Sequence, residues 1–137
     1  MITALVTTDP ISASAYADLV ASDAFGAVVT FSGDVRNIDL GKEVISLTYE
    51  IHPSAQEVLH EIVTEVASKY ELGSVAVVHR YGAIEIGESA FVVAVSSEHR
   101  GPAFAACSDL VDTVKARLPI WKYQVFADGT DQWVNCA

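Results

Sequence analysis

Residues 74–96 read SVAVVHRYGAIEIGESAFVVAVS, in which two short apolar segments flank a turn region that contains two glycines. The segments at 74–80 and 90–96 have the length and composition of buried β-strands. Only nine residues separate them, whereas a parallel crossover needs about a dozen or more. We therefore expect an antiparallel hairpin, which favours an α+β fold over a doubly wound parallel sheet.

Three more strands are expected, at residues 27–31, 44–50 and 120–126. The compact apolar run of the first predicts a buried strand. In the second, apolar side chains alternate with more polar ones, which predicts a half-buried strand whose core-facing residues are Ile45, Leu47 and Tyr49. The polar segment 35–42 between these two strands has the composition of a loop.

Three helices are expected, at about residues 12–22, 54–69 and 102–118. The second begins with Ser54 and Glu57, an S-x-x-E pattern that predicts a capping box. Its apolar residues recur at helical spacing and form one stripe, made of Ala55, Val58, Leu59, Ile62, Val63 and Val66. In the first helix Leu19 and Val20 are expected on the buried side, and Pro119 ends the third helix. The helices should cover a mixed or antiparallel sheet.

Length, composition and charge limit the class of protein. A chain of 137 residues, 51% of them hydrophobic, is expected to form one domain over residues 1–137 with an ordinary core. The net charge of −10 disfavours general binding to nucleic acid or to anionic membranes. No apolar run approaches the roughly 20 residues of a membrane helix, and the N-terminal residues lack the pattern of a secretory signal. We therefore expect a cytoplasmic protein.

Cysteine and histidine residues offer no sign of a metal site. Cys107 and Cys136 are too few for a disulfide framework and lack the spacing of metal ligands. Cys107 lies on the apolar face of its predicted helix and is expected to be an inert core thiol. The histidines at 52, 60 and 79 also lack ligand spacing. Neither a metal nor another cofactor is expected.

The few basic residues are unevenly distributed along the chain. Residues 99–122 contain two aspartates and four basic residues, which are Arg100, Lys115, Arg117 and Lys122. The net charge of this segment is +2, whereas that of the rest of the chain is −12. Such a segment in an acidic protein is typical of a site for a small anion, although Lys115 and Arg117 are equally compatible with a solvated helix face. His99 and Arg100 precede the last predicted helix, where free N–H groups favour phosphate. Lys122 follows an apolar segment, where a partly desolvated amine can act as base or nucleophile.

Five segments form a recognisable set. They are GAVVTFSG leading to VRN (26–37), LTYE (47–50), HRYG with IGE (79–88), SSEHR with AF (96–104), and Lys115 followed by PIWK (115–122). In this order they resemble the large, catalytic subunit of molybdopterin synthase, over residues 9–134. Each segment alone is weak, but five in register are highly specific.

The resemblance implies an α/β-hammerhead-type fold and a homodimer. A small ubiquitin-like sulfur-carrier subunit would bind at each end of this dimer and complete a heterotetramer. The carrier's C-terminal Gly-Gly, as a thiocarboxylate, would enter a pocket of the large subunit. Two sulfurs would then be transferred to cyclic pyranopterin monophosphate, which forms the dithiolene of molybdopterin. Both the cyclic phosphate and the carrier terminus are anions, which fits the cationic segment.

Site residues follow from the same resemblance. Lys115 and Lys122 match the family's two active-site lysines. Lys115 would contact the carrier terminus and the reacting carbon, and Lys122 would act as general acid/base or stabilise developing charge. His99 and Arg100 match a substrate-anchoring pair. Arg36 matches an arginine that binds the phosphate, and a contact across the dimer interface is left open.

Three of the departures from the family pattern bear on whether the chain is catalytic. Asp34 stands where some relatives have a basic residue, Gln124 stands where many have glutamate, and the chain ends at Ala137 without a longer tail. These departures motivate one alternative, a non-catalytic subunit that binds the carrier or a pterin. A second alternative, an unrelated regulatory dimer that binds a small anion, rests on the charge pattern alone. In the first hypothesis the sulfur comes from the carrier, so neither cysteine is needed.

Overall fold

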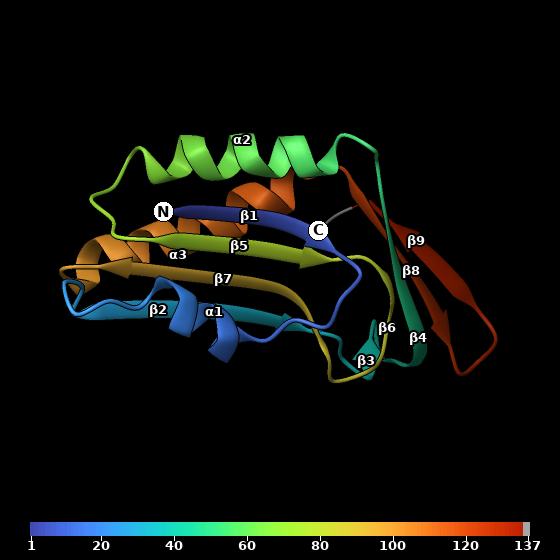
Figure 1. Ribbon diagram of the computed structural model, residues 1–137. Coiled ribbons are helices and arrows are strands. Elements are labelled where there is room, and N and C mark those ends of the chain that lie inside the picture. Colours follow the sequence, from blue (N-terminus) through green and yellow to red (C-terminus); the bar gives the residue numbers. More distant parts are fainter. Residues whose placement is uncertain (136–137) are drawn as a thin grey trace.

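The computed structural model describes residues 1–135. These residues form a four-stranded sheet of order β1-β5-β7-β2 and a five-stranded sheet of order β3-β4-β8-β9, in which β6 also pairs with β4. In Figure 1 the second sheet lies at one end of the first, with its strands running across those of the first sheet. The elements are β1 (Ile2–Thr7), α1 (Ala13–Val20), β2 (Ala27–Asp34), β3 (Ile38–Asp39), β4 (Lys42–Ile51), α2 (Ala55–Ala67), β5 (Val75–Arg80), β6 (Gly82–Ile84), β7 (Ser89–Ser97), α3 (Arg100–Arg117), β8 (Ile120–Phe126) and β9 (Asp131–Val134).

The expected hairpin is confirmed. Strands β5 and β7 pair antiparallel from Val75↔Val95 to His79↔Phe91. All of β5 and nearly all of β7 are buried, because helices cover both faces of this part of the sheet. Strand β2 pairs antiparallel with β7, and β1 pairs parallel with β5, so the sheet is mixed. The predicted α+β class is therefore confirmed.

Helices α2 and α3 pack on one face of the four-stranded sheet, and α1 packs on the other (Figure 1). The main core lies between α2, α3 and the sheet. It includes all but one residue of the stripe predicted for α2, and Val58 is only partly buried at its border. Burial of this stripe is what holds α2 on the sheet, since apolar area removed from water is the main stabilising contribution.

Strand β1 is absent from the sequence-based predictions. It runs parallel to β5 from Ile2↔Val75 to Thr7↔Arg80. Its outer edge is occupied by the side chain of Gln56 on α2. The Gln56 Oε1 atom accepts a hydrogen bond from the Val6 N–H (2.9 Å), and its Nε2 donates to the Ala4 carbonyl (2.8 Å). A side-chain amide thus satisfies two backbone groups that a further strand would otherwise bond.

Two expectations about buried faces are wrong. In β4 the pairing with β8 shifts register between Val44 and Ser46, and this bulge turns Ile45 outward, where it is 57% exposed. Leu47, beyond the bulge, is buried as expected. In α1 Val20 is buried but Leu19 is 46% exposed, because only one side of this short helix contacts the sheet.

The start of α2 also differs from its prediction. Ser54 has helical backbone angles (φ −79°, ψ −4°) and makes no capping hydrogen bond, so the capping box does not form. Its Oγ instead lies 2.8 Å from Nδ1 of His52. A capping side chain needs an extended backbone at its own position, as Ser12 has before α1, where Oγ accepts from the Ala15 N–H.

The predicted buried strand at 27–31 is longer and more exposed than expected. β2 continues to Asp34, and its residues alternate between intermediate and exposed, because it is an edge strand. Helix α3 begins at Arg100, two residues before the predicted start. Pro102 lies in its first turn, where backbone N–H groups have no partner within the helix. Within residues 1–135 no helix has the length and apolar character needed to span a bilayer.

Candidate functional site

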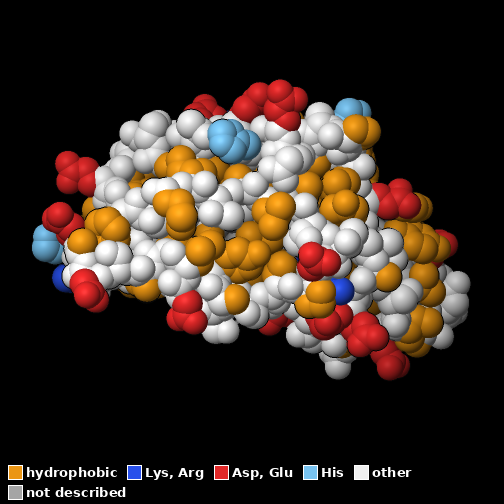
Figure 2. All heavy atoms as spheres, viewed as in Figure 1, with side chains coloured by type: hydrophobic (Ala, Val, Ile, Leu, Met, Phe, Trp, Pro, Cys, Tyr) orange, Lys and Arg blue, Asp and Glu red, His pale blue; other side chains and the backbone are white. Residues whose placement is uncertain are grey.

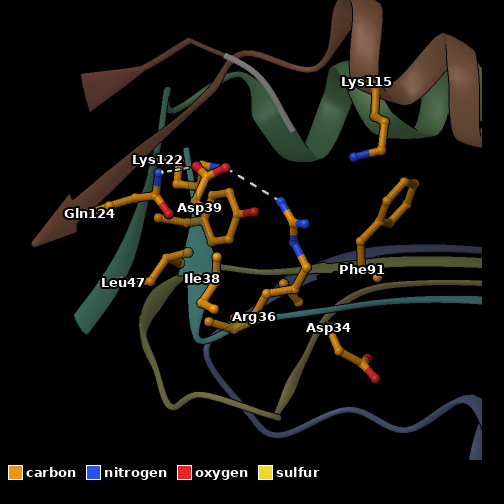
Figure 3. Close-up of a pocket in the computed structure, with 13 residues that line it drawn as sticks. Asp34, Arg36, Ile38, Asp39, Leu47, Phe91, Lys115, Lys122 and Gln124 are labelled. Atoms are coloured by element: carbon orange, nitrogen blue, oxygen red, sulfur yellow. Dashed lines mark hydrogen bonds and ion pairs between the residues drawn. The ribbon is translucent and has the colours of Figure 1, made fainter. Parts of the chain in front are cut away.

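A pocket of about 220 Å³ lies where the two sheets meet, next to the C-terminal end of α3 (Figure 3). Segments far apart in the sequence form its wall, which consists of Gly33, Asp34, Val35, Arg36, Ile38, Asp39, Leu47, Tyr49, Ala90, Phe91, Lys115, Lys122 and Gln124.

Three of the predicted site residues line this pocket. Arg36 follows β2, Lys115 lies in the last turn of α3, and Lys122 lies in β8. Pro119 separates the two lysines, so the chain leaves α3 and enters β8 with both side chains near the same space. On the face of the molecule shown in Figure 2, acidic side chains are widely spread and basic ones are scarce. Three cations around one small pocket therefore create a local positive potential suited to phosphate or carboxylate.

Aromatic rings form the wall beneath Lys115. Its Nζ atom lies 6.0 Å from the centroid of the Phe91 ring, within the range of a cation–π contact. Phe91 stacks on His79 with centroids 5.2 Å apart. His79 in turn meets the ring of Tyr49 edge-on at 5.0 Å. The lysine is thus supported by a packed stack instead of a mobile surface.

His79 is a buried imidazole that sequence reasoning set aside. Burial lowers the pKa of His79 to about 4, and the nearby charge of Lys115 acts in the same direction. The ring is therefore neutral at pH 7. Its Nδ1 atom lies 2.8 Å from the Arg80 carbonyl and acts as the donor, which leaves Nε2 without a hydrogen-bond partner among the described residues. A neutral ring here adds no charge to repel an anion or the lysine.

A carboxylate–amide contact crosses the pocket. Gln124 is 2% exposed, and its Nε2 donates to Oδ2 of Asp39 at 2.7 Å. The other oxygen, Oδ1, lies 3.4 Å from Nη2 of Arg36 (Figure 3). The hydrogen bond from Gln124 lowers the pKa of Asp39, and the charges of Lys122 and Arg36 lower it further. No sequence pattern pointed to Asp39, which falls in the segment predicted as a loop.

Asp34 adds a second carboxylate at the pocket wall. Its Oδ1 accepts hydrogen bonds from the hydroxyls of Ser32 (2.6 Å) and Ser89 (2.8 Å), and these bonds lower the pKa of Asp34. In Figure 3 its side chain points away from Arg36 and the two lysines. The negative charge of Asp34 is therefore directed to the serines and not into the cluster of cations.

His99 and Arg100 lie at the opposite end of α3 from Lys115. Fifteen residues of helix at 1.5 Å per residue place Arg100 about 22 Å from Lys115 along the axis. His99 borders a separate hollow with Phe25, Tyr70 and Pro102. Within a single chain, His99 and Arg100 therefore do not reach the pocket that Lys115 and Lys122 line.

The remaining predicted groups lie outside the pocket. Arg117 forms an ion pair with Glu65 of α2, in agreement with a solvated helix residue. Cys107 is buried, and burial raises the pKa of its thiol to about 11, as expected of a core thiol. Cys136 lies outside the described residues. Within residues 1–135 no group of three or more His, Cys, Asp or Glu side chains is arranged to hold a metal ion.

Fold and pocket together define an α+β protein with a cationic pocket where two crossing sheets meet. The family model described as MoaE protein matches residues 6–117. The chain belongs to this family.

Curated relatives carry the name molybdopterin synthase catalytic subunit. The protein from Salmonella typhimurium is 44% identical over 121 residues, which cover 88% of this chain and 80% of the relative. The Arabidopsis thaliana protein is 41% identical over 115 residues, or 83% of this chain. The chain spans only 58% of the length of the Arabidopsis relative and 64% of the rat one.

Solved structures share the fold. The crystal structure of molybdopterin synthase from Staphylococcus aureus matches with a TM-score of 0.88 at 32% identity and covers 96% of both chains. A Helicobacter pylori structure, described as a complex of subunits 1 and 2 of molybdopterin-converting factor, matches with a TM-score of 0.73. At 19% identity this second likeness concerns the fold alone.

Proposed function

We propose that this chain is the catalytic subunit of a molybdopterin synthase. It transfers two sulfurs in succession to cyclic pyranopterin monophosphate, each from the thiocarboxylate of one carrier molecule, whose terminus becomes a carboxylate. The observation that carries this proposal is the pocket of about 220 Å³ into which three separate segments bring Arg36, Lys115 and Lys122. Both reactants present an anion, and a cluster of three cations is the arrangement that binds and orients anions. Family membership supports the same assignment.

Each cation has its own role in this proposal. Lys115, held over the Phe91 ring, contacts the carrier terminus and the reacting carbon. Lys122, on the opposite wall, acts as general acid/base or stabilises charge that develops during transfer. Arg36 binds the substrate phosphate, for which its planar, multidentate guanidinium is suited.

His99 and Arg100 complete the pocket of a second copy of the chain in this proposal. The outer edge of β2 has no strand partner within residues 1–135. Beside it, a hollow of about 310 Å³ lies between β2 and α3, and its lining includes Val29 and the 59%-exposed Phe104. In the proposed dimer a two-fold axis passes through this hollow perpendicular to α3, so the two α3 helices run antiparallel. Arg100 of one copy then lies near Lys115 of the other.

The remaining partner is the ubiquitin-like carrier, one for each large subunit. Its C-terminal tail enters the pocket described above, and the assembly is a heterotetramer. The structure from Helicobacter pylori, solved as a complex of two subunits, supports this arrangement at the level of the fold. The proposed compartment is the cytoplasm, supported by the unpaired Cys107 thiol.

Reconstitution tests the proposal. The purified chain, thiocarboxylated carrier and cyclic pyranopterin monophosphate are mixed, and the dithiolene product is followed through its oxidised fluorescent derivative. We expect product that depends on both partners. Lys115→Ala is expected to lower the rate more than about 100-fold while the fold and the dimer persist, because it removes a charge that contacts the reacting atoms.

Arg117→Ala is the matched control, since it removes a cation from the same turn of α3 but outside the pocket. It should retain most of the activity. Near-normal turnover by Lys115→Ala would remove this residue from the mechanism. Saturable carrier binding without turnover would instead identify a non-catalytic binding subunit.

A further inference from the structure

Asp39 joins two parts of the pocket that come from distant segments. One carboxylate oxygen accepts the hydrogen bond from the buried amide of Gln124, 85 residues later in the sequence. The second oxygen faces the guanidinium of Arg36 at 3.4 Å. Because Gln124 is fixed within β8 by burial, it fixes the carboxylate as well. Asp39 is thus an immobile acceptor presented to a mobile arginine.

Arg36 needs such an acceptor to stay at the pocket. Its side chain is 76% exposed, and an exposed arginine has many rotamers of similar energy. An isolated surface ion pair is weak, in part because two side chains must be ordered at once. Here only Arg36 remains to be ordered. The contact therefore has a smaller entropic cost than a pair between two mobile side chains.

We infer that Asp39, held by Gln124, is a positioning residue that orients Arg36 toward the phosphate of the substrate. The inference rests on the proposed use of this pocket for a phosphate-bearing substrate. It also gives Gln124, which departs from the family pattern, a defined partner. In this chain the carboxylate belongs to Asp39 on β3 and the amide to Gln124 on β8. Together the two side chains carry one negative charge.

Asp39→Asn is the decisive variant, because asparagine can still accept the hydrogen bond from Gln124 but lacks the charge that attracts Arg36. Binding of inorganic phosphate is measured without carrier, by NMR titration of the backbone amides of Gly33 and Arg36. The KM for cyclic pyranopterin monophosphate is measured in the reconstituted reaction. We expect about tenfold weaker phosphate binding and a similar rise in KM, with little change in kcat.

A double-mutant cycle separates positioning from a merely structural role. In the Arg36→Ala background, Asp39→Asn should have no further effect on phosphate binding, since the residue through which it acts is absent. The swapped pair Asp39→Asn with Gln124→Glu moves the carboxylate to β8 and keeps a hydrogen bond between positions 39 and 124. It should bind phosphate as weakly as Asp39→Asn, because the charge no longer faces Arg36.

Three results would overturn the inference. Unchanged or tighter phosphate binding by Asp39→Asn would show that the carboxylate does not hold Arg36 for the anion or competes with it. Additive effects of the two substitutions would show that Asp39 acts independently of Arg36. Recovery of affinity by the swapped pair would mean that only the net charge of the pocket matters. Phosphate binding needs no carrier, so a wild-type chain without turnover would refute the proposed function and leave this test intact.

Discussion

The four-stranded sheet has two edges, and the chain treats them differently. At β1 the amide of Gln56 bonds one N–H and one carbonyl of the outer edge. At β2 no further strand takes this place within residues 1–135, and an apolar hollow with the exposed Phe104 lies alongside. An unprotected edge beside apolar surface is a site for pairing with another chain. The molecule closes one edge with its own side chain and leaves the other open, which is where the proposed second copy would pair.

The largest expected effect comes from breaking the open edge. Phe104→Asp places a carboxylate in the apolar hollow beside β2, so the dimer should dissociate into monomers. Product formation should fall about 100-fold or more, because Arg100 and His99 no longer reach the partner's pocket. Light scattering after gel filtration and the reconstituted reaction measure the two effects.

Leu5→Asp is the control on the closed side, since Leu5 is an exposed apolar residue of β1. It should leave the dimer intact. A Phe104→Asp variant that remains dimeric would show that the copies join elsewhere.

The second prediction sharpens the assignment of the two ends of α3. Lys115→Ala and Arg100→Ala should each be inactive as homodimers. In the proposed dimer each pocket takes Lys115 from one chain and Arg100 from the other. In a heterodimer of the two variants, one pocket therefore lacks both side chains and the other has both. Unfolding and refolding an equal mixture should therefore restore about a quarter of wild-type activity, as random pairing of subunits predicts. An inactive mixture with heterodimers present would place Arg100 and Lys115 in the same pocket of one chain.

The third prediction concerns acid, which should loosen the β1 side of the sheet first. His79 pairs with Val6 of β1 and has a pKa lowered from 6.5 to about 4. Between these values the unfolded chain binds a proton that the folded chain excludes. The free energy of unfolding should therefore fall as pH decreases, by about 3 kcal/mol in total.

Denaturant unfolding at several pH values measures this contribution. His79→Gln keeps a polar side chain but does not titrate, so its unfolding free energy should depend less on pH between 6.5 and 4. As the pH is lowered, amide hydrogen exchange should speed up in β1 and β5 before it does in β2. Equal pH dependence of the two proteins would mean that His79 takes up its proton in the folded state as readily as in the unfolded one.

The smallest effect is expected from opening the closed edge. Gln56→Ala removes two hydrogen bonds to β1, which should cost about 1–2 kcal/mol of unfolding free energy. Exchange of the Val6 amide should accelerate. Gln56→Glu retains the acceptor but not the donor and should fall between the wild type and Gln56→Ala. No change in Val6 exchange would contradict the role of this amide as an edge cap.

Local patterns predicted the parts of the fold that depend on local order. The hairpin of β5 and β7 and the stripe of α2 follow from apolar runs and helical spacing within short windows. The bulge at Ile45 and the helical backbone of Ser54 depend on tertiary contacts, which a short stretch of sequence does not reveal. The same holds for β1, whose pairing with β5 joins residues 73 positions apart.

The candidate site shows a similar limit. The charge pattern and the resemblance pointed to Lys115, Lys122 and Arg36, and these residues line one pocket. Asp39 carried no signal, because its meaning depends on a hydrogen bond to Gln124, 85 residues away. His79 was rejected as a metal ligand and otherwise counted only as part of a strand and of the resemblance. Its burial between two aromatic rings becomes visible only when three strands are in place.

The parallel pairing of β1 with β5 also sets an order of events during synthesis. Ile2 pairs with Val75, and at about 5–20 residues per second the ribosome needs roughly 4–15 s to make the chain between them. Gln56, which bonds the outer edge of β1, also emerges before β5. Strand β1 therefore has no strand partner until β5 is made, after the whole of α2. In the growing polypeptide it is during this time a segment that chaperones can bind. Because β5 is made before β7, α3 and β8, β1 can pair with it before the rest of the sheet can form.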